Sequence, residues 1–299
     1  MHRYGAIEAG GTKFVCAVGS GPEQIADTIR IDTTTPSETL GAVIDFFRQH
    51  HTSVPLEALG IACFGPIELD RSSPTYGHIT TTPKTGWAQT NIVGILQSAL
   101  NLPAGFDTDV NAAALGEHRW GAAQDVDSFI YLTVGTGIGG GAMVEGKLLH
   151  GLLHPEMGHI LLPRHDNDID FNGVCPFHGA CFEGLASGPA IQARWGHPAD
   201  ELNDDHEAWS LQAHYMAVGL WSLICTLSPR RLILGGGVME QEHLLPAIRS
   251  SLQSVAAEYL QVQQLGVQIE DFVVTPGLGS RAGISGALAL AELAVRNAP

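Results

Sequence analysis

Short apolar runs and helical stretches alternate along the first part of the chain. Apolar runs at 5–7 and 14–18 flank Gly10-Gly11, a pattern that predicts a β-hairpin closed by a glycine turn. Further elements are predicted in alternation: a helix at 39–50, a buried strand at 59–63, a helix at 91–100, a strand end at 104–107 and an alanine-rich helix at 110–120. Such alternation predicts an α/β domain.

The second half of the chain repeats the opening pattern. A strand at 129–134, a glycine turn at 135–141 and a return strand at 142–144 predict another hairpin, and a polar, glycine-rich insert occupies 163–184. The remaining predicted elements are helices at 187–195, 206–227, about 241–260 and 280–295, and strands at 231–234 and 272–275. With 299 residues and roughly 150 residues per domain, the repetition suggests two α/β lobes.

Composition narrows the classes of function. The 15 basic and 31 acidic residues give a net charge of −16, which argues against nucleic-acid binding because phosphates attract a basic surface. The longest nearly apolar stretch, residues 215–227, is shorter than the ~18 residues that a membrane span needs. Residues 1–8 contain no apolar export signal. We therefore expect a cytoplasmic protein that binds neither nucleic acid nor membrane.

The five cysteines fall into two groups. Cys16, Cys63 and Cys225 lie within apolar runs, where a buried free thiol is expected. The other two belong to the pattern Cys175-x2-His178-x2-Cys181, and His159 lies 16 residues before the first of them. Two sulfur and two nitrogen ligands can close a tetrahedron around a structural Zn²⁺ ion, whereas a redox pair would favour Cys-x-x-Cys.

Three glycine turns, at 9–13, 135–141 and 234–238, each lie at the end of a predicted strand. Glycine allows backbone N–H groups to approach phosphate oxygens closely. The third turn is expected to lead into a helix, whose N-terminus favours anions. Any one of them could be an ordinary hairpin turn, but the three together favour phosphate binding.

Two acids and an amide, Asp107, Asp109 and Asn111, lie where a strand gives way to a helix. Either acid by itself could be a helix N-cap. A carboxylate at this place could also accept the proton of a sugar hydroxyl that attacks a phosphoryl group, while its neighbour helps to organise Mg²⁺. The sequence leaves both interpretations open.

Together these motifs resemble the ROK family (repressors, open reading frames and sugar kinases) over essentially the whole chain, and within it the bacterial zinc-containing fructokinases. The resemblance is carried by residues 8–13, 62–67, 74–84, 86–87, 107–117, 135–141 and 235–239 and by the metal-binding segment. Glu8 replaces the aspartate usual in ROK glucokinases, and Gly173 stands where those enzymes often carry a further cysteine. Both departures are similar to the fructokinase branch.

The resemblance implies the actin-like (ribonuclease H-like) sugar-kinase fold. Two α/β lobes, each with a mixed five-stranded sheet, would enclose a ligand cleft. We expect the lobes at 1–118 and 119–299, with a zinc-binding insert at about 155–184 and a helix at about 280–297 that packs back on the first lobe. A homodimer is also expected from the family.

The resemblance further implies which residues act on Mg²⁺-ATP and a hexose. Asp109 would be the catalytic base. The ATP-binding residues would be Gly10, Gly11, Thr12, Lys13, Thr136, Gly137, Gly139, Gly140, Pro189, Gly235, Gly236, Gly237, Val238 and Met239. The sugar-binding residues would be Gly65, Pro66, Thr108, Asp109, Glu156, His159 and Glu183, although Glu183 could equally be a solvated residue at a helix start.

The expected reaction is ATP-dependent phosphorylation of D-fructose to fructose 6-phosphate. The stretch 74–87, with Lys84 and Trp87, has the form found in fructokinases, although it could be a surface loop. A ROK glucokinase or an N-acylmannosamine-type hexose kinase is the alternative. The alternative of another class is a sugar-sensing regulatory protein, which would be expected to lack Asp109 or the glycine turns. ROK repressors begin with a basic helix-turn-helix domain. Because the first glycine turn here already starts at Gly10, we expect no such domain.

Overall fold

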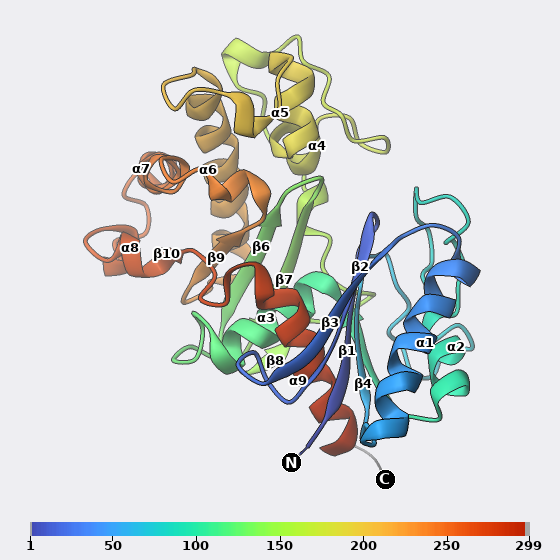
Figure 1. The fold of residues 1–299 in the computed structure, drawn as a ribbon. Coiled ribbons are helices and arrows are strands. Elements are labelled where there is room, and N and C mark those ends of the chain that lie inside the picture. The colour runs from blue at the N-terminus through green and yellow to red at the C-terminus, as the bar shows by residue number, and fades with distance from the viewer. Residues whose placement is uncertain (1, 297–299) are drawn as a thin grey trace. The chain divides into compact units, whose positions relative to one another are not determined.

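The structure, a computed structural model, describes residues 2–296 and divides into two compact units (Figure 1). The first unit comprises residues up to 125, residues 147–155 and residues from 277 onward. The second comprises residues 126–146 and 156–276. A boundary after residue 118 would cut helix α3 (Asp109–Trp120), and the observed division lies after residue 125 instead.

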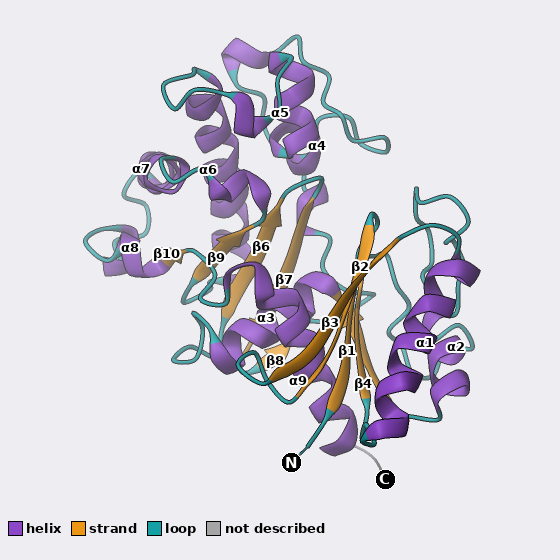
Figure 2. Ribbon diagram, in the orientation of Figure 1, coloured by secondary structure: helices purple, strands orange, loops and turns teal. Residues whose placement is uncertain are grey.

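The first unit is built on a mixed five-stranded sheet with the order β3-β2-β1-β4-β5, of which β1 to β4 are labelled in Figure 2. Strand β1 runs antiparallel to β2 and parallel to β4, which in turn is parallel to β5. The strands are β1 (Tyr4–Ala9), β2 (Lys13–Gly19), β3 (Ile25–Asp32), β4 (Leu59–Cys63) and β5 (Ala104–Thr108). The predicted glycine-turn hairpin is therefore present as β1 and β2.

Helices cover both faces of this sheet. Helices α1 (Pro36–Ser53) and α2 (Ile92–Leu100) pack on one face, and α3 and α9 (Ala282–Arg296) pack on the other (Figure 1). Helix α9 approaches the strands closely, because a Cβ atom at Gly60 would lie 1.7 Å from the carbonyl oxygen of Ala287. The C-terminal helix thus packs back on the first unit, as the family resemblance implies.

The second sheet also has five strands, in the order β10-β9-β6-β7-β8. Its strands are β6 (Phe129–Val134), β7 (Ile138–Val144), β8 (Lys147–Leu148), β9 (Leu232–Gly235) and β10 (Val273–Val274). Strand β6 runs antiparallel to β7 and parallel to β9. The helices of the second unit are α4 (Phe182–Ala186), α5 (Gly188–Trp195), α6 (Ala208–Leu227), α7 (Leu244–Ala256) and α8 (Ile269–Phe272).

Three features differ from what the sequence predicts. Strand β3 was not predicted, because most of its side chains are exposed and polar. The third glycine turn leads into a 3₁₀ helix at Gly237–Glu240 rather than into α7, which begins later and ends earlier than expected. Cys225 is exposed rather than buried. In the stretch 74–87, for which the sequence also allowed a surface loop, Trp87 is a core residue whose Nε1–H donates to the carbonyl oxygen of Thr34 at 2.8 Å.

Within residues 2–296, none of the helices has the length and apolar character that crossing a membrane requires.

Candidate active site and metal centre

Asp109 is the first residue of α3 and directly follows β5. The helix N-cap is Thr108, whose buried hydroxyl oxygen accepts the backbone N–H of Asn111 at 3.1 Å. Asp109 is therefore not needed as the cap. Its side chain is half-buried, and burial raises the pKa of its carboxyl group to about 6. A carboxylate of this basicity is suited to accept a proton near neutral pH.

The carboxylate of the neighbouring Asp107 accepts hydrogen bonds from other groups of the protein. Its buried Oδ1 accepts the backbone N–H of Thr108 at 2.8 Å and the Nδ2–H of Asn111 at 2.7 Å. Its Oδ2 lies 2.8 Å from Nε2 of His150, and this hydrogen bond raises the pKa of the histidine. Both carboxylate oxygens thus already accept protein donors, which fits support of the strand–helix junction better than ligation of Mg²⁺.

His154 holds the turn that contains Gly65 and Pro66. Its buried ring accepts the backbone N–H of Ile67 on Nε2 at 3.1 Å, and burial lowers its pKa. A Cβ atom at Gly65 would lie 3.2 Å from the Cε1 atom of this ring. The Gly65–Pro66 peptide bond is cis. His154 therefore fixes a turn that the family resemblance assigns to the sugar.

The sequence alone does not predict the roles of His150 and His154, because histidines outside the metal pattern are most simply interpreted as solvated side chains. Their roles depend on partners more than 35 residues away in the chain, at Asp107 and Ile67. One local signal was available. Both histidines fall in the short segment immediately before Glu156, which the family resemblance assigns to the sugar.

The first glycine turn is exposed at its tip, and its base is fixed by hydrogen bonds. The N–H of Gly10 donates to the carbonyl oxygen of Lys13 at 3.0 Å, and the hydroxyl of Thr33 donates to the carbonyl oxygen of Gly10 at 2.7 Å. Gly11 and Thr12 are exposed. The pKa of Glu8, which lies just before the turn, is raised to about 7, mainly by burial and secondarily by the charge of Asp109. The carboxyl groups of Glu8 and Asp109 are therefore close enough to interact electrostatically.

The three segments of the second unit that are expected to bind ATP come together. The N–H of Gly188, next to the exposed Pro189, donates to the carbonyl oxygen of Gly135 at 2.8 Å. A Cβ atom at Gly188 would lie 3.6 Å from Cγ2 of Val238, and Gly236 has a φ of +92° at the end of β9. The turn at 135–137, the start of α5 and the segment 235–239 are therefore neighbours.

Two of the predicted phosphate-binding glycines lie in strand β7 rather than in the turn. Gly139 pairs with Thr133, and Gly140 pairs with Leu132. A Cβ atom at Gly140 would lie 2.5 Å from Sδ of Met157, so packing already requires a glycine there. The exposed residue at the tip of the turn is Thr136.

The two acidic residues expected at the sugar have different surroundings. Glu156 is exposed and precedes the 3₁₀ helix Met157–His159, where its carbonyl oxygen accepts the N–H of His159 at 3.0 Å. Glu183 is half-buried in α4, and its Oε2 accepts the backbone N–H of Ile138 at 3.0 Å. Glu183 is therefore not the solvated helix-start residue that the sequence also allowed.

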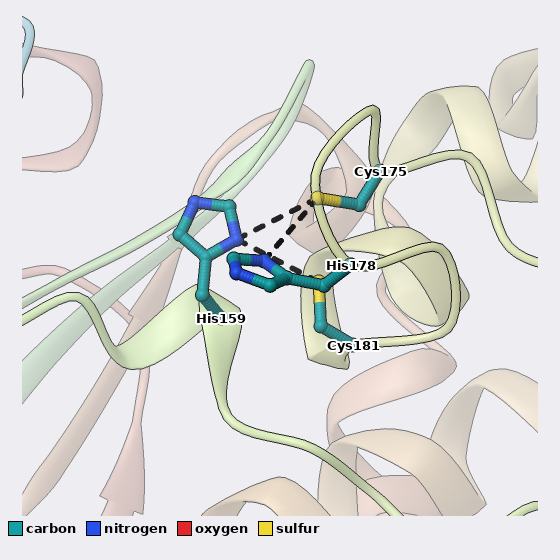
Figure 3. Close-up of side chains that lie close together, drawn as sticks. All are labelled: His159, Cys175, His178 and Cys181. Carbon is teal, nitrogen blue, oxygen red and sulfur yellow. Dashed lines mark hydrogen bonds between the residues drawn. The ribbon is translucent and has the colours of Figure 1, made fainter. Parts of the chain in front are cut away.

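The four predicted metal ligands form one cluster (Figure 3). One ligand atom from each of His159, Cys175, His178 and Cys181 lies within 4.8 Å of the others. Nδ1 of His159 is 3.7 Å from Sγ of Cys175 and 3.6 Å from Sγ of Cys181, and Nδ1 of His178 is 3.7 Å from Sγ of Cys175. This arrangement could hold a metal ion.

The part of the insert around Asp168 is held in place by contacts that do not involve the four ligands. The buried carboxylate of Asp168 accepts the Nε–H of Arg194 at 2.9 Å and the hydroxyl of Tyr215 at 2.7 Å. The Arg194 guanidinium also lies 4.1 Å from the ring centroid of Phe171. From residue 163 to residue 181, the only buried apolar side chains are the two cysteines. This part of the insert therefore has no apolar core of its own beyond the two cysteines.

Comparison with known proteins places these features in a family. The ROK family profile matches residues 4–294. A relative from Bacillus subtilis is 50% identical over 292 residues, which cover 98% of this chain and 96% of the relative's chain. The fructokinase of Zymomonas mobilis is 44% identical over 298 residues, which cover 98% and 97% of the two chains.

Solved structures agree with this similarity. A ROK family glucokinase from Streptomyces griseus, in complex with glucose and AMPPNP, has a TM-score of 0.74 and 25% identity, covering 97% of this chain and 99% of its own. The chain belongs to the ROK family and has the actin-like sugar-kinase fold, with two mixed five-stranded sheets.

Proposed function

We propose that this protein is an ATP-dependent fructokinase that converts D-fructose to fructose 6-phosphate. The similarity to the fructokinase of Zymomonas mobilis, which extends over nearly the whole of both chains, carries the proposal. The environment of Asp109 supports it, since a carboxyl group at the start of α3 has a pKa of about 6 and is not used as the helix cap.

In the proposed reaction, Asp109 accepts the proton of the sugar hydroxyl while the hydroxyl oxygen attacks the γ-phosphorus of ATP. The bond from that phosphorus to the β–γ bridging oxygen breaks, and ADP leaves. At neutral pH a carboxyl group with a pKa of about 6 is mostly ionised, and it is a stronger base than an ordinary aspartate. Mg²⁺, which enters with ATP, supplies positive charge that stabilises the phosphate oxygens.

The proposed binding residues follow from family resemblance and from the grouping of segments in each unit. Gly10–Lys13, Thr136 and Gly137 would contact phosphates, and Gly139 and Gly140 would support the turn from strand β7. Pro189 and Gly235–Met239 would hold the adenosine. The sugar would contact Gly65, Pro66, Thr108, Glu156, His159 and Glu183. His154 and Asp107 would act indirectly, because they fix the turn at Gly65 and the start of α3.

We also propose that the four-residue cluster binds a structural Zn²⁺ ion. Zinc–sulfur bonds of about 2.3 Å and zinc–nitrogen bonds of about 2.05 Å at a tetrahedral angle place sulfur and nitrogen about 3.6 Å apart. Three of the four sulfur–nitrogen pairs in the cluster lie 3.6–3.7 Å apart. Two cysteines and two histidines fill all four positions, so the ion would stabilise structure rather than bind substrate.

The preferred sugar is tested by a coupled ADP-release assay with fructose, glucose, mannose and N-acetylmannosamine. Fructose and glucose are isomers, so discrimination depends on hydroxyl groups that meet fixed partners, each mismatch costing roughly 1–3 kcal/mol. We expect the highest kcat/KM with fructose, and slower reaction with mannose or glucose. A higher kcat/KM with glucose would make the protein a ROK glucokinase. Release of ADP with none of the sugars would favour a sugar-sensing protein.

Because the proposed reaction consumes ATP, we propose that the protein is cytoplasmic. A homodimer is expected from the family resemblance.

A further inference from the structure

Glu183 links the metal-binding segment to the glycine turn at 135–137. Helix α4 begins directly after the ligand Cys181, which is its N-cap residue. From the first turn of α4, the Oε2 atom of Glu183 accepts the backbone N–H of Ile138 at 3.0 Å. A Cβ atom at Gly137 would lie 2.5 Å from the same oxygen, so the carboxylate also lies against the turn itself.

A second contact reaches Ile138 from the ligand His159. This histidine ends the 3₁₀ helix Met157–His159, whose middle residue is Gly158. A Cβ atom at Gly158 would lie 1.8 Å from the carbonyl oxygen of Ile138, so the backbone of the 3₁₀ helix packs directly on this residue. The segments that carry His159 and Cys181 therefore contact the carbonyl and amide sides of one buried residue.

Ile138 is the first residue after the turn, so its position fixes one end of the turn. The other end is held at Gly135, whose carbonyl oxygen accepts the N–H of Gly188 at 2.8 Å. The N–H of Gly135 donates across the turn to the carbonyl oxygen of Gly137 at 2.9 Å. The segment from Cys181 to Gly188 thus contacts both ends of the turn, through Glu183 and through the start of α5.

We infer that the metal centre and Glu183 set the conformation of the turn at 135–137 and thereby control affinity for a nucleoside triphosphate. Glu183 is a positioning residue here, because it acts on the turn through the N–H of Ile138. The inference rests on the proposed function in two respects: that the four-residue cluster binds a metal ion, and that this turn binds nucleotide phosphates. The mechanical link between the metal centre and Ile138 does not depend on the second of these.

Amide hydrogen exchange measured by NMR tests the mechanical link. Compared with the metal-loaded wild type, we expect the Ile138 amide to exchange at least ~10-fold faster in Glu183→Ala and in the chelated protein, because its acceptor is lost or displaced. Glu183→Gln should stay close to the wild type, since its side-chain oxygen can accept the same N–H. Unchanged exchange at Ile138 in Glu183→Ala, or after metal removal, would overturn the inference.

The Ile130 amide is an internal control in the same sheet. It donates to the carbonyl oxygen of Arg231 at 3.1 Å, on the β6–β9 side of the sheet. Its exchange should be unchanged in every sample that retains the fold. Equal acceleration at Ile130 and Ile138 would indicate general unfolding and would contradict a specific link.

Calorimetry with Mg²⁺-AMPPNP, in the absence of sugar, tests the consequence for the nucleotide. We expect about 10-fold weaker binding by Glu183→Ala, equal to about 1.4 kcal/mol, and affinity within about 3-fold of the wild type for Glu183→Gln. Omitting sugar separates this effect from any contact between Glu183 and fructose. Equal affinity in Glu183→Ala and the wild type would overturn this inference alone, whereas no binding by the wild type would overturn the proposed function.

Discussion

Replacement of Asp109 by asparagine should lower kcat by at least ~10²-fold, equal to about 2.7 kcal/mol of transition-state stabilisation. The amide cannot accept the proton of the attacking hydroxyl. The fold should persist, because Thr108 caps the helix and the asparagine oxygen can still accept the N–H of Val110, at 2.9 Å in the native protein. Affinity for the sugar should be largely kept, as steady-state kinetics would establish. A near-normal kcat would remove Asp109 from this role.

The pH dependence provides a second readout for the same variant. Because the base must be ionised, wild-type kcat should fall about tenfold per pH unit below the Asp109 pKa of about 6. Glu8, whose pKa is raised to about 7 despite the opposing charge of Lys13, also titrates in this range. In Asp109→Asn, the residual activity should lose the part of the decrease in kcat at low pH that is due to protonation of Asp109. Asp45→Asn, which removes an exposed carboxylate on α1, is the matched control and should behave like the wild type.

Removal of the metal, or Cys181→Ser, should lower the melting temperature by about 5 °C or more, because each kcal/mol is worth a few degrees in a protein of this size. The metal-binding half of the insert has no core of its own, and Phe177 within it is 63% exposed. Thermal unfolding and metal analysis, with one zinc ion expected per chain, check this prediction.

Cys225→Ser is the matched control, because it removes an exposed thiol on α6. It should leave both the metal content and the melting temperature unchanged. An absence of zinc in the purified protein, or equal melting of Cys181→Ser and the wild type, would refute the structural role of the cluster.

Much of the fold could be predicted because the determining signals are local. The glycine-turn hairpins and the buried strand β4 are visible as apolar runs with glycine between or after them. Strand β3 is different. It lies at the edge of its sheet and carries Asp27, Arg30 and Asp32, so its hydrogen bonds to β2 define it while apolar alternation does not.

The candidate sites show the same contrast. The metal cluster could be predicted because three of its ligands lie within seven residues of the sequence. Cysteine and histidine at this spacing indicate a metal site without knowledge of the fold. The contacts of Glu183 with Ile138 and of His154 with Ile67 join residues 45 and 87 positions apart. The local sequence does not indicate which residues these side chains contact, so only the packed structure could reveal the pairs.

The most direct test of the proposed function is to identify the product formed from D-fructose and Mg²⁺-ATP by the purified protein. ³¹P and ¹³C NMR locate the phosphate on the sugar, and ADP is measured in the same sample. The proposal predicts fructose 6-phosphate and one ADP for each sugar phosphate formed. Phosphate on another hydroxyl, or ADP formed without any sugar phosphate, would contradict it.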